Sequence, residues 1–273
     1  MTKPFASSED LSAKAECLEK LADDGVYALT AEGDPNAGAI EGEDFIVAIE
    51  ARATPASARD WLAQLRTLTD EPVKYLVLTH YHAVRVLGAS ALDAQHIVTS
   101  TATCRLIEER GQQDWESEYG RMPRLFKEPE GIPGLTWPTV TFDTEYTIEL
   151  GGDQVPLELR FEGRGHTEGD IVVWHPGSRT LFAGDLVESE AALHTGDAFD
   201  FDWASGTLDR LKAYRAETLV GGRGAVARGV AATDAAIEQT RGFLQVLISQ
   251  VREVHERKGS LEEAFDATHA AIF

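Results

Sequence analysis

Hydrophobic residues recur with two periods in the first half of the chain, one typical of helices and one typical of strands. Helical spacing predicts an N-terminal helix over residues 8–23, with Ser8 at the N-cap, and a second helix from Thr54-Pro55 to about Leu68. Short apolar runs between Gly- and Asp-rich turns predict strands at 26–30, 37–40, 45–50 and 73–78.

The second half repeats this plan of strands followed by helices. Strands are predicted at 140–142, 145–149, 154–161, 170–175, 180–184 and 218–220. Helices are predicted at about 101–119, 204–214, 233–257 and from Ser260, where Ser260-x-x-Glu263 is a capping box. No stretch poor in apolar residues marks a domain boundary. We therefore expect an α+β fold of two helix-covered sheets in a single domain, 1–273, comprising an N-terminal helix (8–23), a core (24–230) and C-terminal helices (231–273).

Charge and composition narrow the class of partner. The 273 residues include 25 Lys and Arg against 46 Asp and Glu, a formal net charge of −21. That field repels nucleic acid and anionic membrane surfaces, so we expect a small-molecule substrate and neither of those partners. There is no apolar run long enough for a transmembrane helix, no signal-like N-terminus and no Cys-x-x-Cys motif. These features predict a cytoplasmic protein.

Two histidines follow the predicted strand at 73–78. His80 and His82 are two positions apart, so on an extended chain their side chains point to the same side, about 6.6 Å apart along the strand. Two imidazoles in this arrangement can bind one cation. The alternative is that they belong to an ordinary solvated loop at the end of a strand, because a short motif of this kind often occurs by chance.

Two further candidate ligands also follow apolar strands. His166 lies in the run Gly163-Arg-Gly-His-Thr-Glu-Gly-Asp170, and Asp185 follows Leu181-Phe-Ala-Gly. Each of them alone is weak evidence for a site. Together with His80 and His82 they place four ligand-type side chains just beyond strand ends, where the active sites of layered folds gather.

These motifs resemble those of the metallo-β-lactamase superfamily, in order and in spacing, over roughly residues 24–230. Thr79-His80-Tyr81-His82 matches the start of its T-H-x-H-x-D-H motif, Gly165 to Asp170 match G-H-T-x-G, and Gly184-Asp185 match the bridging aspartate. The resemblance implies a four-layer αββα sandwich of two facing mixed sheets. It also implies that His80, His82 and His166 hold a metal ion, with Asp185 beside it.

The chain departs from the superfamily pattern at the second metal site. Val84 and Arg85 stand where the family has Asp and His, and Arg223 replaces the histidine of its G-H-G motif. A two-metal centre is therefore not expected. We hypothesise that Arg85 or Arg223 pairs with Asp185 and also binds an anionic group of the substrate, since a guanidinium is a permanent cation with five donors. The alternative is a structural ion pair that fills an abandoned site.

One divalent cation, zinc or else Fe²⁺, is the cofactor that these residues imply. The expected activity is hydrolysis of an ester, thioester, lactone or amide by one metal-activated water, on a small substrate that could be anionic. Asp185 is either a fourth ligand or the general base. Two alternatives stay open: a mononuclear iron dioxygenase of the persulfide dioxygenase type, and a binding protein whose active site is retired.

Other polar residues receive simpler interpretations. His194 is expected to line the site and contact substrate, whereas Asp197 and its neighbours 200 and 202 are expected to be solvated loop charges or caps. His175, in a His-Pro-Gly-Ser turn, is expected to be exposed, and Tyr81 to point away from the ligands. The long helix at 233–257 could form a homodimer interface or simply cover a sheet.

Overall fold

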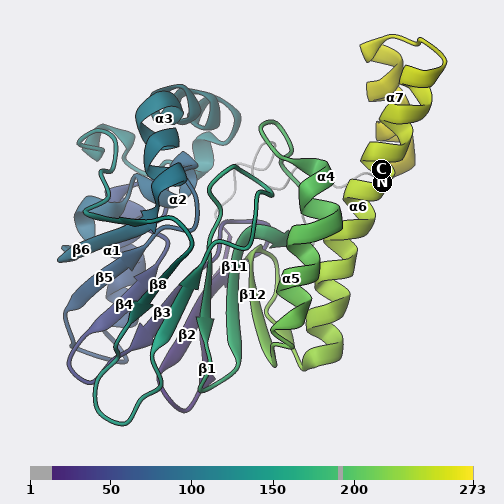
Figure 1. The fold of residues 1–273 in the computed structure, drawn as a ribbon. Coiled ribbons are helices and arrows are strands. Elements are labelled where there is room, and N and C mark those ends of the chain that lie inside the picture. Colours follow the sequence, from purple (N-terminus) through teal and green to yellow (C-terminus); the bar gives the residue numbers. More distant parts are fainter. Residues whose placement is uncertain (1–13, 190–192, 273) are drawn as a thin grey trace.

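The structure is a computed structural model that describes residues 14–189 and 193–272 (Figure 1). Within these residues two mixed β-sheets face each other and helices cover their outer faces, as predicted. The strands are β1 (Glu16–Ala22), β2 (Val26–Ala31), β3 (Ala37–Glu41), β4 (Ile46–Ile49), β5 (Val73–Val77), β6 (His96–Ser100), β7 (Val140–Phe142), β8 (Glu145–Ile148), β9 (Leu157–Arg160), β10 (Val172–His175), β11 (Thr180–Glu188), β12 (Thr218–Arg223) and β13 (Ala227–Arg228). The α-helices are α1 (Pro55–Leu65), α2 (Ala83–Val86), α3 (Thr101–Arg121), α4 (Asp200–Asp202), α5 (Leu208–Ala213), α6 (Val230–Glu256) and α7 (Leu261–Ile272).

The two sheets come from the two halves of the chain. In the described residues the first sheet has the order β1-β2-β3-β4-β5-β6-β7, antiparallel from β1 to β4 and parallel from β4 to β7. The second sheet has the order β13-β12-β11-β10-β9-β8, in which β11 and β12 are parallel. The repeated plan in the sequence therefore corresponds to one sheet per half.

Side chains that alternate along the strands create the layers. Val26 and Ala28 of β2 face the second sheet, whereas Tyr27 and Leu29 pack on the side covered by α1. The outer face of the second sheet packs against α5 and α6 through residues such as Trp203. Apolar residues on both faces of the central strands explain why these strands read as continuous hydrophobic runs in the sequence.

The predicted N-terminal helix is wrong where the structure can test it. Residues 16–22 form β1, which pairs with β2 in antiparallel register, and residues 8–13, including Ser8, lie outside the described residues. Leu18 packs on the α1 side of the sheet and Leu21 packs between the sheets. A helix would place both on one face, so pairing with β2 overrides the local helical pattern. The division of the whole chain into one domain stays a prediction.

Several other boundaries shift, and one burial prediction is wrong. The strand predicted at 180–184 continues to Glu188, and the helix predicted at 204–214 is a π-helical turn (Trp203–Thr207) followed by α5. His175 ends β10 and is 1% exposed, because the Nδ1 of its ring accepts a hydrogen bond from the Ser178 amide and folds the ring back over the turn.

Candidate metal centre

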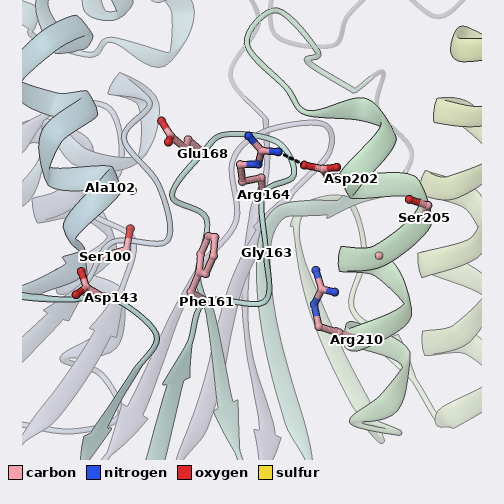
Figure 2. Close-up of a pocket in the computed structure, with 11 residues that line it drawn as sticks. Ser100, Ala102, Asp143, Phe161, Gly163, Arg164, Glu168, Asp202, Ser205 and Arg210 are labelled. Atoms are coloured by element: carbon pink, nitrogen blue, oxygen red, sulfur yellow. Dashed lines mark hydrogen bonds and ion pairs between the residues drawn. The ribbon is translucent and has the colours of Figure 1, made fainter.

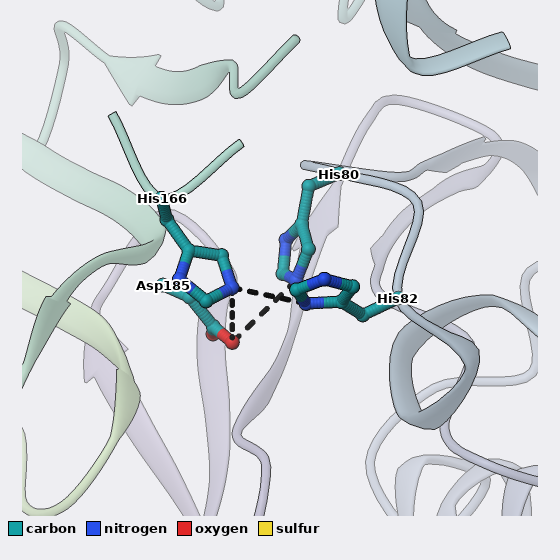
Figure 3. Close-up of side chains that lie close together, drawn as sticks. All are labelled: His80, His82, His166 and Asp185. Atoms are coloured by element: carbon teal, nitrogen blue, oxygen red, sulfur yellow. Dashed lines mark hydrogen bonds and ion pairs between the residues drawn. The ribbon is translucent and has the colours of Figure 1, made fainter. Parts of the chain in front are cut away.

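Four buried side chains from separate segments meet at one point (Figure 3). His80 and His82 follow β5, His166 lies in the loop between β9 and β10, and Asp185 belongs to β11. None of the four is more than 4% exposed. Gly184, with a φ of +53°, sets the bend in β11, and a β-carbon there would lie 2.5 Å from the Thr79 Oγ1. The glycine therefore allows β11 to carry Asp185 up to the histidine loop.

The ligand-type atoms of these side chains converge on a small volume. The Asp185 Oδ2 lies 3.5 Å from the His80 Nε2 and 3.5 Å from the His166 Nε2, and the latter lies 3.0 Å from the His82 Nδ1. Ligand atoms bound tetrahedrally at zinc distances of about 2.0–2.1 Å lie about 3.3–3.4 Å from one another. The spacing of this cluster therefore fits a metal ion.

Hydrogen bonds behind His80 fix which of its nitrogens is free. The Thr79 hydroxyl donates to the Glu50 Oε1, so its oxygen accepts from the His80 Nδ1 at 2.9 Å. In the neutral ring the His80 Nε2 then carries the lone pair, and this atom is buried without a hydrogen-bond partner and faces a carboxylate oxygen. A lone pair opposite a carboxylate is repulsive unless a cation lies between them, which is the second reason that the site fits a metal.

His82 is oriented by two carboxylates that the sequence analysis did not assign to the site. Its Nε2 lies 3.5 Å from the Asp197 Oδ1 and 3.9 Å from the Asp114 Oδ1, so its Nδ1 turns toward His166. Burial opposes protonation of His82, but Asp197 and Asp114 together raise its pKa to about 9. Asp197 is therefore a half-buried partner of a candidate ligand, and its interpretation as a solvated loop charge is wrong.

Asp185 divides its two oxygens between different partners. Its Oδ2 faces the histidines, while its Oδ1 accepts a hydrogen bond from the Nη2 of Arg85. Burial alone would raise the pKa of Asp185, but Arg85 and then His80 hold it well below the usual range. Asp185 is therefore a carboxylate, with one oxygen available to a ligand.

The other arginine forms a separate ion pair. The Arg223 Nε lies 3.3 Å from the Glu188 Oε1, and its Nη1 donates to the carbonyl of Gly33 at 2.8 Å. Arg85 and Arg223 are 1% and 4% exposed, respectively. Of the two arginines, Arg85 pairs with Asp185, as hypothesised for one of them, and their binding of substrate stays a prediction.

Comparison with known proteins agrees with this geometry. The metallo-beta-lactamase superfamily model matches residues 31–223, which is more than half of the chain. The chain belongs to the metallo-β-lactamase superfamily. The match includes all four clustered residues and ends at Arg223. The chain is therefore metallo-hydrolase-like, and the His80, His82, His166 and Asp185 cluster could hold a metal ion.

The chain matches two curated relatives over about half of their length. The chain is 32% identical to a metallo-beta-lactamase type 2 of Bacillus sp. (strain 170) over 53% of this chain and 49% of the relative. It is 28% identical to the 2,4-dinitroanisole O-demethylase subunit alpha of Nocardioides sp. (strain JS1661) over 61% of this chain and 45% of that protein. The chain thus spans about half the length of these relatives.

A solved structure of the superfamily covers more of the chain. The metallo-beta-lactamase from Pontibacter korlensis superimposes with a TM-score of 0.67 over 85% of this chain and 99% of its own, at 24% identity. At this identity the likeness establishes the fold alone. Within the described residues no helix is both long and apolar enough to cross a membrane.

The second metal position of the superfamily motif is filled by protein atoms. Val84 is an apolar side chain that is 1% exposed, and the Arg85 guanidinium contacts Asp185 and the carbonyls of Asn36 and Gly222. A side chain at Gly222 would collide with the Asp185 Oδ1. The Arg85 guanidinium therefore contacts Asp185 on the side where the superfamily motif has a second set of metal ligands.

Two cavities lie near these loops, and the larger one does not contain the cluster. A cavity of about 540 Å³ lies behind the His166 loop, and its charged side chains include the ion pair between Arg164 and Asp202 (Figure 2). A smaller cavity of about 260 Å³ is lined by His194, Asp197 and one face of α3. Since Asp197 lines the smaller cavity and faces His82, this cavity lies beside the candidate metal centre.

His194 and Tyr81 both reach this smaller cavity. The ring of His194 lies 5.4 Å from that of His82, centroid to centroid, so it lies beside the cluster, and its contact with substrate stays a prediction. The Tyr81 hydroxyl donates to the Asp197 Oδ2 at 2.6 Å. The Tyr81 ring lies 4.6 Å from the His82 ring, centroid to centroid, and its hydroxyl braces the carboxylate that orients His82.

Proposed function

We propose that the protein is a hydrolase that uses a single divalent cation, zinc, held by His80, His82 and His166 with Asp185 beside it. The substrates are small molecules with an ester, thioester, lactone or amide bond. The observation that supports this most strongly is the arrangement of Asp185, whose Oδ2 faces the Nε2 atoms of two histidines at 3.5 Å while Arg85 occupies its Oδ1.

The protein's own residues supply orientation and a proton acceptor. A bound zinc ion of this kind lowers the pKa of a coordinated water to about 7 and polarises a carbonyl. Glu50 and Thr79 hold the His80 ring, and Asp197 holds the His82 ring, so the ligand atoms are oriented before anything binds. The Asp185 Oδ2 accepts a proton from water or binds the ion, because Val84 offers no group that can move a proton.

Metal content is the first test of this proposal. Protein purified without added metal is analysed for elements, together with His82→Ala and the matched control His255→Ala, which removes an exposed histidine of α6. We expect about one zinc per chain in the wild type and the control, and its loss in His82→Ala. One iron per chain would instead favour oxygenase chemistry, and no metal even after zinc or iron is supplied would favour a binding protein.

Activity is the second test. A panel of 4-nitrophenyl esters, a thioester, a lactone and a β-lactam is assayed with zinc-loaded protein and with the Asp185→Asn variant. We expect hydrolysis of at least one class, with a loss of at least about a hundredfold in kcat/KM for Asp185→Asn, since general base groups contribute about 10²–10⁴ in rate. Zinc-loaded protein that hydrolyses no class at all would contradict the proposed function.

A further inference from the structure

The cavity beside the candidate metal centre has one wall made by a single helix. Arg110, Asp114, Ser117 and Arg121 of α3 line it, and His194 and Asp197 line the opposite side. These α3 positions are four, three and four residues apart, which places them on one face of a helix. The polar face of α3 therefore forms a continuous wall of about 16 Å between Arg110 and Arg121, at 1.5 Å per residue.

The acidic side chains that line this cavity are less exposed than its two arginines. Asp114 and Asp197 have side chains only 10% and 9% exposed, and both carboxylates face His82. Their remaining oxygens accept hydrogen bonds from the Ala83 amide and the Tyr81 hydroxyl. The acidic groups are therefore covered and already bonded.

The two arginines lie at the mouth of the same cavity. The side chains of Arg110 and Arg121 are 43% and 41% exposed. The Arg110 Nη1 lies 3.5 Å from the Asp197 Oδ2, and the Arg121 guanidinium lies 3.9 Å from the Glu118 Oε1 and 3.4 Å from the Ser117 hydroxyl. Each guanidinium carries five N–H donors, so these few long contacts leave most of them free for a ligand.

We propose that Arg110 and Arg121 select substrates that carry a carboxylate, with Arg121 as the principal contact. The proposal rests on the proposed function, because it assigns the substrate class of that same site. Arg121 is the better candidate because its ion pair is the longer one, 3.9 Å against 3.5 Å, and Arg110 is also held against the face of the Tyr81 ring. In a protein with a net charge of −21, such exposed cations beside the cluster attract an anion that the rest of the surface repels.

Two esters that differ by one carboxylate test this assignment. The substrates are mono-4-nitrophenyl glutarate and 4-nitrophenyl valerate, whose acyl chains have the same length. The ratio of their kcat/KM values is measured for zinc-loaded wild type, Arg121→Gln, Arg110→Gln and the control Arg59→Gln, which removes an exposed arginine of α1. Binding of glutarate is measured on the same proteins by calorimetry.

The expected results separate this proposal from the hydrolase proposal. We expect Arg121→Gln to lower the glutarate-to-valerate ratio about tenfold or more and to weaken glutarate binding by a similar factor, with a smaller effect for Arg110→Gln. Valerate hydrolysis and Arg59→Gln should stay within about twofold of wild type. Equal ratios in wild type and Arg121→Gln, or an equal loss in Arg59→Gln, would overturn the assignment. If neither ester is hydrolysed, glutarate binding alone decides whether the arginines bind carboxylates, and the hydrolase proposal is decided separately by the full substrate panel.

Discussion

Asp185 separates two regions of the same buried site that supply positive charge in different ways. On its Oδ2 side, three imidazoles converge and their ligand-type nitrogens fit an exchangeable cation. On its Oδ1 side, the guanidinium of Arg85 is a permanent cation covalently attached to the chain. The Asp185 carboxylate thus lies between the position of an exchangeable cation and the fixed cation of Arg85. Its contact with Arg85 keeps its other oxygen turned toward the histidines.

The difference also shows in how the two regions are packed. Around Arg85, the Nη1 and Nη2 donate to the carbonyls of Asn36 and Gly222 and to Asp185, so protein acceptors hold the charged end of the side chain. At the histidine cluster, the His80 Nε2 is buried without a hydrogen-bond partner and faces the Asp185 Oδ2 at 3.5 Å. A buried polar atom of this kind is costly unless a ligand satisfies it, and two ligand-type atoms facing each other fit a cation between them.

Removal of the fixed cation should have the largest effect. Arg85→Met leaves Asp185 as a buried carboxylate without its partner, and we expect the free energy of unfolding to fall by about 3–5 kcal/mol in urea titrations. Arg85→Met combined with Asp185→Asn should recover part of this loss, because the buried negative charge is removed as well. A loss below about 1 kcal/mol in the single variant would contradict the view that Arg85 neutralises the site.

Interruption of the hydrogen bonds behind His80 should have the next largest effect. Thr79→Val removes the hydroxyl between His80 and Glu50, and we expect zinc affinity to fall about 10–100-fold in a chelator competition assay, as for other groups that orient ligands. Thr99→Val is the matched control, since the Thr99 hydroxyl is also buried but donates to the Leu78 carbonyl. Unchanged zinc affinity in Thr79→Val would show that His80 needs no support from Glu50.

Loss of the carboxylate that faces His82 should have a smaller effect. Asp197→Asn weakens the acceptor that orients the His82 ring, and we expect about a tenfold loss of zinc affinity. Asp114 still faces the same nitrogen, which limits the loss. Asp202→Asn, which breaks only the exposed ion pair with Arg164, should leave zinc affinity unchanged. An equal loss of zinc affinity in the two variants would mean that Asp197 acts through its negative charge and not by orienting the His82 ring.

Restoration of one motif histidine should have the smallest effect. Arg223→His rebuilds the G-H-G motif, but we expect zinc binding to stay at about one per chain, because Arg85 still occupies the Asp185 Oδ1. Stoichiometry is measured by titration with a competing chromophoric chelator. A second equivalent of zinc in this variant would show that Arg85 can be displaced, and the contrast between the two sides of Asp185 would then be wrong.

Local patterns predicted the parts of the fold that depend on local chemistry. The apolar runs of β5 and of the first part of β11, the two histidines after β5 and Asp185 were all evident in the sequence. So was the capping box, in which the Glu263 amide donates to the Ser260 hydroxyl at 3.1 Å. The N-terminal strand was missed because Leu18 and Leu21 also fit a helix, and only pairing with β2 decides between the two. His175 was missed because its burial depends on a folded turn.

The sequence by itself determined which residues can bind a metal and which cannot, because His80, His82, His166 and Asp185 have ligand atoms and Val84 has none. It also determined that a guanidinium replaces a ligand at Arg85. Only the tertiary structure decided that Arg85 pairs with Asp185, that Asp197 turns His82, and that α3 directs two arginines toward the same cavity. These contacts join residues up to about a hundred positions apart, and their geometry arises only when the two sheets pack face to face.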